Sequence, residues 1–422
     1  MKAYKRLIAG TAAAVMLALT CGGCGAEKEP VTITIWNYYN GEQLEAFNRM
    51  VQNFNDTVGK EQGITVESSS QGSVNDLETN VLNAAEGKVG AEELPNIFSG
   101  YADTAYALDQ QGMVVDLNDY LTESEKSEYI EGYLTEGDFD GDGSIKIFPT
   151  AKVTEVLYLN DTDWQAFSQA TGTTYDDLAT VEGLTAAAEK YYNWTDAQTE
   201  APDDGRALFG RDAMANYLLI GAKELGCTIF DVQNGKMTLD FDKNVIRKLW
   251  DNYYVPFVKG WFAAIGRFRS MISRWAMCWL CGFQLQRHLL PRAGHGERHR
   301  ELRHRHDGAA QPEVCGRRGC GRAAGAGMVV TAGTEEEINA SVEFLKWFTQ
   351  PEHNISFSVD SGYLPVTTAA NDMEAIKTSG LELSPKMERI LSNAVQSVKN
   401  NTLMRQVPLR AAARPARCWN TA

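Results

Sequence analysis

Strand and helix patterns alternate between residues 31 and 112, and this alternation limits the fold more than any other feature of the chain. Apolar and polar side chains alternate over residues 31–36, as in a strand with one buried face. Residues 44–54 then repeat apolar side chains at helical spacing. The strand patterns at 64–66 and 95–98 are each followed by a helix pattern, the first of them capped by Ser73. Such alternation predicts an α/β fold with a mostly parallel sheet.

The loops after the first and third predicted strands are the expected place for a ligand site. In open α/β sheets, ligands bind beyond the carboxyl ends of the strands. Those ends fall at residues 37–40, Asn-Tyr-Tyr-Asn, and at residues 100–103, Gly-Tyr-Ala-Asp. Both loops combine aromatic and polar side chains, which suits a small polar solute.

The rest of the chain continues the pattern, and its length is sufficient for two domains. An extended run covers 145–160. Capping boxes are predicted to begin two helices, one at Thr162 with Gln165 and one at Thr334 with Glu337. A further strand is predicted over 328–331, and further helices over 181–192, 212–225, 242–254 and 335–348 and from Pro385 onward.

The first 23 residues have the composition of an export signal. A basic start precedes an apolar stretch over 7–19 that is too short to span a bilayer. Glycines directly before Cys24 favour a lipoprotein signal peptide over 1–23 and a lipid on Cys24. The expected location is the cell membrane, with the protein lipid-anchored on the extracytoplasmic face. The alternative is an ordinary secreted protein that is cut nearby.

The net charge argues against nucleic acid and anionic lipid as partners, and the positions of the cysteines argue against a disulfide framework. The formal charge of −15 argues against nucleic acid as a partner and against electrostatic docking on anionic lipid. Of the eight cysteines, Cys21 and Cys24 belong to the leader and Cys227 stands alone, while the others fall in two atypical segments. We therefore expect no disulfide framework.

Several segments resemble, in the same order, the bacterial family 1 extracellular solute-binding proteins, the maltose-binding-protein-like lipoproteins of ABC transporters. After the leader cysteine, they are the strands at 33–36 and 94–98, the run 148–161 from Phe-Pro to Leu-Asn-Asp, the helix 340–348, and Ser-Gly-Tyr-Leu-Pro-Val at 361–366. The resemblance covers most of 24–270 and 326–400.

The resemblance implies a two-lobed periplasmic-binding-protein-like fold of type II, in which each lobe is a mostly parallel sheet flanked by helices. The hinge between the lobes is expected at 149–152 and near 328–332. The implied lobes are 24–149 with about 328–368 for lobe 1, and 150–327 with about 369–422 for lobe 2.

Ligand-binding residues are carried over from the resemblance position by position. Aromatic rings stack on the apolar faces of sugars, and Asn, Asp and Lys side chains hydrogen-bond their hydroxyls. The alternatives are core packing for each aromatic, above all for Trp250, and a structural ion pair between Lys152 and Glu155. The expected residues are Asn37, Tyr38, Tyr39, Tyr101, Asp103, Lys152, Glu155, Trp250 and Asn252.

Residues 138–145, Asp-Phe-Asp-Gly-Asp-Gly-Ser-Ile, match the front of an EF-hand calcium loop. Asp138, Asp140 and Asp142 would be the first three ligands, but position 12 is Pro149 instead of a bidentate acid. The favoured interpretation is a hairpin turn, which also requires Asp and Gly. We expect no cofactor and no metal, and calcium at this loop would have a structural role.

Residues 261–325 and 404–422 differ abruptly from the rest in composition. The first segment holds 12 arginines and no lysine, with five of the six histidines. Pairs such as Cys278 and Cys281 suggest zinc, and the arginines suggest a nucleic-acid arm, but neither explains the abrupt change. Off-frame translation of GC-rich DNA yields Arg, Ala, Gly, His, Pro and Cys. We hypothesise frame disturbances near 270–271, restored by about 325, and near 403–404.

The function implied by the resemblance is capture of a small solute, a sugar or oligosaccharide, for an ABC import permease. Closure of the two lobes of a monomer would trap the solute, and no reaction would be catalysed. An exported carbohydrate-active enzyme and a ligand-presenting sensor lipoprotein without a transport role are the alternatives. The sequence has no nucleophile elbow and no HExxH motif, and outside 261–325 His353 is its sole histidine, which disfavours histidine-dependent catalysis.

Overall fold

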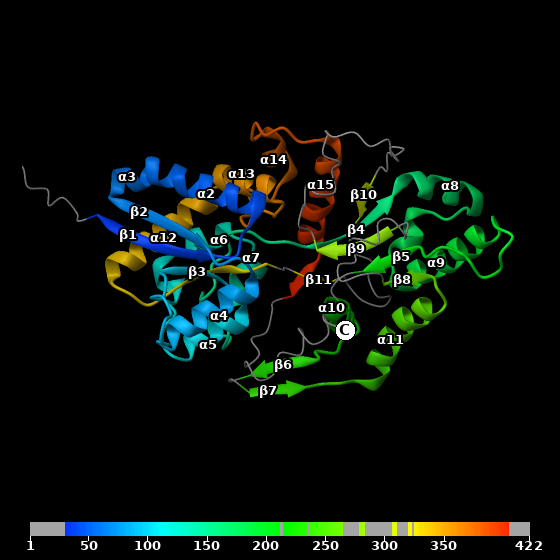
Figure 1. Cartoon of the computed structure of the whole chain (residues 1–422), viewed down its shortest axis with the longest axis horizontal. Coiled ribbons are helices and arrows are strands. Elements are labelled where there is room, and N and C mark those ends of the chain that lie inside the picture. Colours follow the sequence, from blue (N-terminus) through cyan, green and yellow to red (C-terminus); the bar gives the residue numbers. More distant parts are fainter. Residues whose placement is uncertain are drawn as a thin grey trace, which may run out of the picture.

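Two sheets, each with helices around it, divide the molecule into two lobes (Figure 1). Strands from residues 31–100 and 327–330 form the sheet of the first lobe, at the left of the figure, and strands from residues 155–309 form the sheet of the second. The structure is a computed structural model that describes residues 30–211, 214–233, 236–264, 278–282, 306–309, 320–322 and 325–404.

The first sheet consists of β1 (Val31–Asn37), β2 (Ile64–Ser70), β3 (Ile97–Gly100) and β12 (Gly327–Val330), in the order β12-β3-β1-β2. β1 pairs in parallel with β2 and β3, as the alternating pattern predicts, while β12 runs antiparallel to β3. The carboxyl ends of β1, β2 and β3 therefore lie at one edge of the sheet.

The helices of the first lobe cover both faces of this sheet. Figure 1 shows α2 (Gly41–Asp56) and α13 (Pro351–Ser361) on one face, and α4 (Val74–Ala85) and α5 (Ala102–Asp109) on the other. The remaining elements are α3 (Val58–Gln62), η1 (Leu117–Tyr120), α6 (Glu123–Glu128), α7 (Glu131–Leu134), η2 (Thr135–Gly137), α12 (Glu335–Thr349) and α14 (Met373–Thr378).

The core of the first lobe is rich in aromatic side chains because α2 presents its apolar stripe to α12. Phe47 and Phe54 of this stripe are fully buried. The Phe54 ring lies edge-on to Phe344 at 5.2 Å and to Trp347 at 5.3 Å between centroids. Burial of each such ring stabilises the fold by about 1.5–3 kcal/mol, so segments some 290 residues apart in sequence are held together.

The second sheet consists of β4 (Glu155–Asn160), β5 (Phe209–Arg211), β8 (Phe262–Ala263), β9 (Cys278–Gly282) and β10 (His306–Ala309), in the order β10-β4-β9-β5-β8. Its strands mix directions, since β4 is antiparallel to β9 and β10 whereas β5 is parallel to β8 and β9. β9 and β10 come from the compositionally atypical segment, where no strand was predicted.

Helices also surround the second sheet, and α15 (Pro385–Asn400) packs against β10 and β4. Two small sheets accompany it, one of β6 (Phe230–Gln233) with β7 (Lys236–Leu239) and one of β11 (Cys320–Arg322) with β13 (Thr402–Met404). The other helices are α8 (Asp161–Thr171), η3 (Tyr175–Leu178), α9 (Val181–Asp196), α10 (Met214–Glu224) and α11 (Lys243–Val258).

Two of the three predicted helix caps are confirmed. Ser73 accepts a hydrogen bond from the Asp76 N–H at the start of α4, and Thr334 forms a capping box with Glu337 at the start of α12. The capping box predicted at Thr162 is wrong. Asn160 caps α8 instead, two residues earlier than predicted, because its side-chain oxygen accepts from the Thr162 N–H at 3.2 Å.

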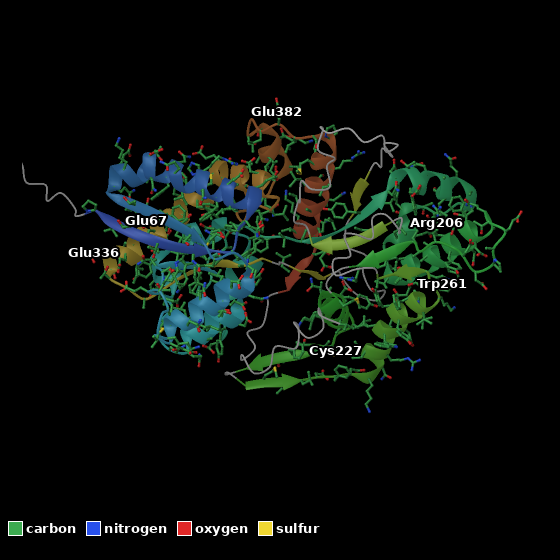
Figure 2. The ribbon with its side chains drawn as sticks, in the orientation of Figure 1. Glu67, Arg206, Cys227, Trp261, Glu336 and Glu382 are labelled. Atoms are coloured by element: carbon green, nitrogen blue, oxygen red, sulfur yellow. The ribbon has the colours of Figure 1, made fainter. Side chains whose placement is uncertain are left out.

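Charged side chains extend outward from both lobes (Figure 2). Glu67, Glu336 and Glu382 are exposed, as is Arg206 in the second lobe, whereas Cys227 is a buried free thiol beside β6. Among the described residues, no helix combines the length and apolar character that a membrane crossing requires.

Candidate functional site

Four tyrosines gather at the carboxyl ends of β1 and β3, and we call Tyr38, Tyr39, Tyr101 and Tyr363 the tyrosine cluster. Tyr38 and Tyr39 follow β1 directly, Tyr101 follows β3, and Tyr363 follows α13. The Tyr38 ring stacks on Tyr101 with centroids 6.4 Å apart, and Tyr39 meets Tyr363 edge-on at 6.2 Å. The structure therefore brings together three of the aromatic residues predicted to bind ligand.

Three rings of the cluster, those of Tyr38, Tyr39 and Tyr363, are buried. The Tyr38 and Tyr39 ring centroids lie 5.3 Å apart. Burial raises the pKa of Tyr38 and of Tyr39 well above the ordinary value for tyrosine. These hydroxyls therefore stay protonated at neutral pH, where each can donate one hydrogen bond and accept others.

Asn37, the last residue of β1, lies fully buried beneath the cluster with one unsatisfied donor. Its side-chain oxygen accepts from the Tyr39 N–H at 3.0 Å, and its carbonyl oxygen accepts from the Gln71 N–H at 2.7 Å. Within the described part of the chain, the Asn37 Nδ2 atom has no hydrogen-bond partner. Buried donors of this kind are rare in native structures.

Asp103 lies two residues after Tyr101, in the first turn of α5, and is half-buried. A carboxylate in the first turn of a helix is stabilised by the helix dipole. The structure thus places Asn37, Tyr38, Tyr39, Tyr101 and Asp103 at the adjoining ends of two parallel strands, as predicted from their positions in the sequence.

Lys152 is fully buried at the expected hinge, where it joins three segments. Its ammonium group forms an ion pair with Glu136 and donates to the Gly325 carbonyl at 3.0 Å. Its backbone exchanges hydrogen bonds with Leu364 in both directions, at 2.7 and 3.1 Å. The polar atoms of Lys152 are thus engaged in cross-links between chain segments.

Glu155 is buried in the second lobe and has partners of its own. Its carboxylate pairs with Arg211 Nη2 at 2.7 Å and accepts from Asn216 Nδ2 at 2.5 Å. The Arg211 guanidinium lies 5.2 Å above the ring centroid of Tyr217. Both Lys152 and Glu155 thus belong to buried ion pairs, but each pairs with a different residue and not with the other.

Trp250 and Asn252 lie on α11, among the elements of the second lobe (Figure 1). Trp250 is 54% exposed and stacks on Tyr254 with centroids 4.6 Å apart, so the core-packing alternative does not apply. Asn252 Nδ2 donates to Glu182 at 3.3 Å. Asn252 also lines an internal cavity of about 10 Å³ beside Arg211, which is room for a single water molecule.

The aspartate-rich loop forms a turn held by its own backbone. Asp138 Oδ1 accepts from the N–H groups of Gly141 and Asp142, at 2.8 and 3.0 Å. The predicted hairpin is wrong, because η2 precedes the turn and a single bridge at Phe148 follows it, instead of two paired strands. Among the described residues, no three His, Cys, Asp or Glu side chains are placed to share a metal ion. Calcium binding at Asp138, Asp140 and Asp142 stays a prediction.

Sequence reasoning did not assign Tyr363, Ser70 or Gln71 to the site. Ser70 Oγ donates to the Tyr39 carbonyl at 2.6 Å, next to the Gln71 contact with Asn37. The parallel register of β2 with β1 pairs Asn37 with Ser70, and this explains why Ser70 and Gln71 lie beside Asn37 and Tyr39. Tyr363 arrives from more than 300 residues away, and its place in the Ser-Gly-Tyr-Leu-Pro-Val motif was the available signal.

The chain matches a known protein family. The family described as bacterial extracellular solute-binding protein matches residues 49–270 and 320–382, about two thirds of the chain. The match is interrupted within the atypical segment 261–325. No curated protein sequence matches the chain.

Solved structures similar to this chain share its two-lobed fold, which confirms the predicted architecture. The cyclic α-maltosyl-1,6-maltose binding protein from Arthrobacter globiformis is 16% identical, with a TM-score of 0.69 over 90% of this chain and 89% of its own. UgpB from Mycobacterium tuberculosis, in complex with glycerophosphocholine, is 17% identical, with a TM-score of 0.67 over 89% and 88%. The sugar-binding protein MalE from Xanthomonas citri is 14% identical, with a TM-score of 0.67 over 89% and 87%.

Proposed function

Because the chain belongs to the family of bacterial extracellular solute-binding proteins, we propose that it captures a sugar or oligosaccharide and delivers it to an ABC import permease. The observation that carries this proposal is the tyrosine cluster above Asn37, at the edge where parallel strands end. The ring of a sugar can stack on Tyr101, and one of its hydroxyl oxygens can accept a hydrogen bond from the unsatisfied Asn37 Nδ2 atom. The neutral tyrosine hydroxyls supply further donors and acceptors without a charge to desolvate.

Similar structures support a carbohydrate as the solute. Several of them hold saccharides, among them maltotriose in a protein from Bdellovibrio bacteriovorus and mannobiose in another. Glycerophosphocholine, which UgpB binds, carries a charged phosphodiester. Among the described residues, those gathered at the tyrosine cluster include no lysine or arginine to pair with a phosphate, and this composition favours the sugar.

We place the hinge at Lys152, where the chain passes between the lobes. Closure about this point would bring the second lobe, with Trp250 and Asn252, toward the tyrosine cluster. The solute would be bound and released unchanged, because the described residues of the site supply hydroxyl and amide groups and the Asp103 carboxylate but no nucleophile paired with a base. Recovery of the sugar in altered form after incubation with the purified protein would contradict this part of the proposal.

We also propose that a lipid on Cys24 holds the protein at the extracytoplasmic face of the membrane, where it acts as a monomer. A single chain already supplies both lobes, so that no second copy is needed to enclose a solute. Release of solute to the permease would accompany reopening of the hinge.

A thermal-shift screen tests the proposed solute class. The probes are maltose, maltotriose, mannobiose, glycerophosphocholine and a tripeptide, each at millimolar concentration. A ligand at 100 times its Kd adds about 2.7 kcal/mol to the free energy of unfolding, which raises Tm by several degrees. We expect a saccharide to raise Tm. A rise with glycerophosphocholine or the peptide alone would contradict the carbohydrate assignment.

A further inference from the structure

Asn40 and Gly41 form an Asn-Gly pair where β1 leads into α2, directly after Tyr39 of the tyrosine cluster. Asparagine loses its side-chain amide most readily when glycine follows it, because glycine has no Cβ to obstruct the approach of its backbone nitrogen. The sequence contains one other such pair, Asn234–Gly235, which lies outside the described residues. The surroundings of Asn40 therefore decide whether the pair at 40–41 can react in the folded protein.

Both residues of this pair are exposed, and little holds them apart. Asn40 has an extended backbone, with φ −144° and ψ 164°, and within the described part of the chain its side chain makes no cap hydrogen bond to α2. The Gly41 N–H belongs to the first turn of α2, where N–H groups have no partner inside the helix. Among the described residues, no heavy atom lies within 4 Å of the position that a Cβ of Gly41 would take. The nitrogen of Gly41 and the side chain of Asn40 are thus open to each other and to water.

The turn into α2 also explains why glycine stands at position 41. Its φ of +53° lies in the left-handed region, which side-chain-bearing residues adopt at a cost. The fold therefore favours the residue that makes Asn40 reactive, and the same residue gives the backbone the freedom to bring its nitrogen to Asn40 Cγ.

We propose that Asn40 is a modification site, at which the side-chain amide is lost through a succinimide formed with Gly41. The Gly41 nitrogen gives its proton to water and bonds to Asn40 Cγ, while the bond from Cγ to Nδ2 breaks and ammonia leaves. Water then opens the ring at either of its two carbonyl carbons. The reaction consumes one water and releases one ammonia, and it yields aspartate or isoaspartate, in which the main chain runs through the former side chain.

Isoaspartate at position 40 acts on the tyrosine cluster because the chain is fixed on both sides. Before it, the Tyr39 N–H donates to Asn37 Oδ1 at 3.0 Å, and the Tyr39 carbonyl accepts from Ser70 Oγ at 2.6 Å. After it, Phe47 of α2 is fully buried, and its ring centroid lies 5.2 Å from that of Tyr39. Isoaspartate inserts one more carbon atom into the main chain between these fixed points and adds a carboxylate, so Tyr39 has to shift within the cluster.

The consequence is a loss of sugar affinity as the protein ages. This loss rests on the proposed function, whereas the deamidation itself does not. Aspartate, the other product, keeps the length of the main chain and places a negative charge at the N-terminus of α2, which the helix dipole favours. Isoaspartate is therefore the product that weakens binding.

Peptide mass spectrometry of the full chain, kept at 37 °C at pH 6 and at pH 8, measures the reaction. We expect Asn40 to convert at least tenfold faster than Asn244, an exposed asparagine that precedes the β-branched Val245. Conversion should be faster at pH 8, because the attacking nitrogen has to lose its proton. Methylation by an isoaspartyl methyltransferase identifies the isoaspartate fraction. Conversion of Asn40 no faster than that of Asn244 would overturn the proposal.

Asn40→Ser is the matched control variant, since serine is as good an N-cap as asparagine but cannot form the ring. Calorimetric titration uses whichever of maltotriose and mannobiose binds the fresh protein. The isoaspartate form, isolated by ion exchange, should bind at least fivefold more weakly than fresh wild type, whereas aged Asn40→Ser should keep the affinity that it had when fresh.

The remaining outcomes separate the modification from the proposed function. Unchanged affinity of the isoaspartate form, or an equal loss in aged Asn40→Ser, would show that the modification does not disturb the cluster. If the fresh protein binds neither saccharide, the proposed function fails, while the mass measurement still decides whether Asn40 is a modification site.

Discussion

Tyr38 and Tyr101 leave two neighbouring parallel strands and stack on each other, with ring planes inclined by 20° and centroids 6.4 Å apart. The parallel register of β1 and β3, which aligns Trp36 with Phe98, brings the two loops to the same edge. An aromatic surface at that edge, above a buried asparagine with an unsatisfied donor, is the feature from which the account of solute capture follows.

The Lys152–Glu136 pair should contribute strongly to stability. Glu136→Gln removes one partner and leaves a buried ammonium group, which costs about 3–5 kcal/mol in the free energy of unfolding. Urea denaturation at pH 7 measures the loss. Glu123→Gln, which breaks the exposed pair with Lys126, is the control and should cost about 0–1 kcal/mol. Equal losses for the two variants would contradict the role assigned to Lys152 at the hinge.

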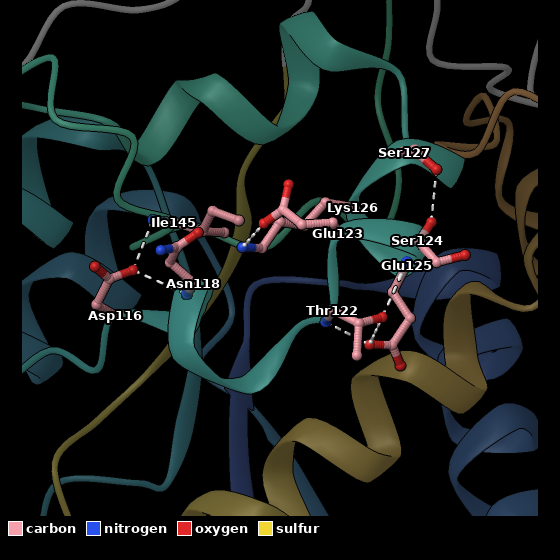
Figure 3. A network of polar contacts seen from close by, with 9 residues as sticks. All are labelled: Asp116, Asn118, Thr122, Glu123, Ser124, Glu125, Lys126, Ser127 and Ile145. Carbon is pink, nitrogen blue, oxygen red and sulfur yellow. Dashed lines mark hydrogen bonds and ion pairs between the residues drawn. The ribbon is translucent and has the colours of Figure 1, made fainter.

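Glu125 should make the stability of the first lobe depend on acid pH. Figure 3 shows Glu125 in its capping box with Thr122, and Lys346 of α12 lies 2.7 Å from the same carboxylate. The hydrogen bond from Lys346, helped by the Thr122 N–H, lowers the pKa of Glu125 from 4.5 to about 2. Because the pKa in the folded state lies below the unfolded value, this contribution is fully present above about pH 4.5 and is lost as pH falls toward 2.

Urea denaturation between pH 2 and pH 6 tests this dependence. Glu125→Gln should be less stable than wild type near pH 6, and the difference should shrink steadily below pH 4.5. Glu128→Gln, at an exposed position in the same helix, should follow the wild-type profile. A constant difference between Glu125→Gln and wild type across this range would show that the carboxylate does not carry the effect.

Local signals in the sequence predicted much of the first lobe. The alternation at residues 31–36 gave β1, and Ser73 and Thr334 marked the starts of α4 and α12, because strand alternation and helix capping act between residues a few positions apart. The strand-end rule also placed Tyr38 and Tyr101 together. Where two residues near a helix start can both act as the N-cap, the sequence does not show which one does. The cap of α8 was therefore predicted at Thr162, whereas the structure has it at Asn160.

Partners distant in sequence could not be predicted. Glu155 pairs with Arg211 across 56 positions, and Tyr363 joins Tyr39 across more than 300, and no periodicity encodes such contacts. The choice between ligand binding and core packing for Trp250 was left open for a similar reason. Its spacing fits a buried helical stripe, and the 54% exposure of the ring in the structure removes the core-packing alternative.

The atypical composition of residues 261–325 leads to a prediction about the gene. The family match stops at residue 270 and resumes at 320, close to the places where the arginine-rich composition begins and ends. Resequencing should find a single-base disturbance near codon 270 with its compensation before codon 325, and another near codon 403. The frame-corrected protein should match the family across the interruption and unfold at a higher temperature. Uninterrupted reads that reproduce the present sequence would refute the hypothesis.

Lipid attachment at Cys24 can be tested by detergent phase separation. The protein produced in bacteria should enter the detergent phase, and the mass of its first peptide should include a diacylglyceryl group on Cys24. Cys24→Ser should move the protein to the aqueous phase, whereas Cys21→Ser should leave it with the detergent. An unmodified first peptide that begins elsewhere would support ordinary secretion.

Sugar binding at the tyrosine cluster is the central claim, and calorimetric titration of maltotriose and mannobiose into wild type, Tyr101→Ala and Tyr175→Ala tests it most directly. Tyr175 is a half-exposed ring of the second lobe that stacks on Trp164, away from the cluster. We predict that wild type and Tyr175→Ala bind one of these saccharides with equal affinity, and that Tyr101→Ala binds at least tenfold more weakly, a loss of about 1.4 kcal/mol. Equal affinity in all three proteins, or no binding by wild type, would contradict the account.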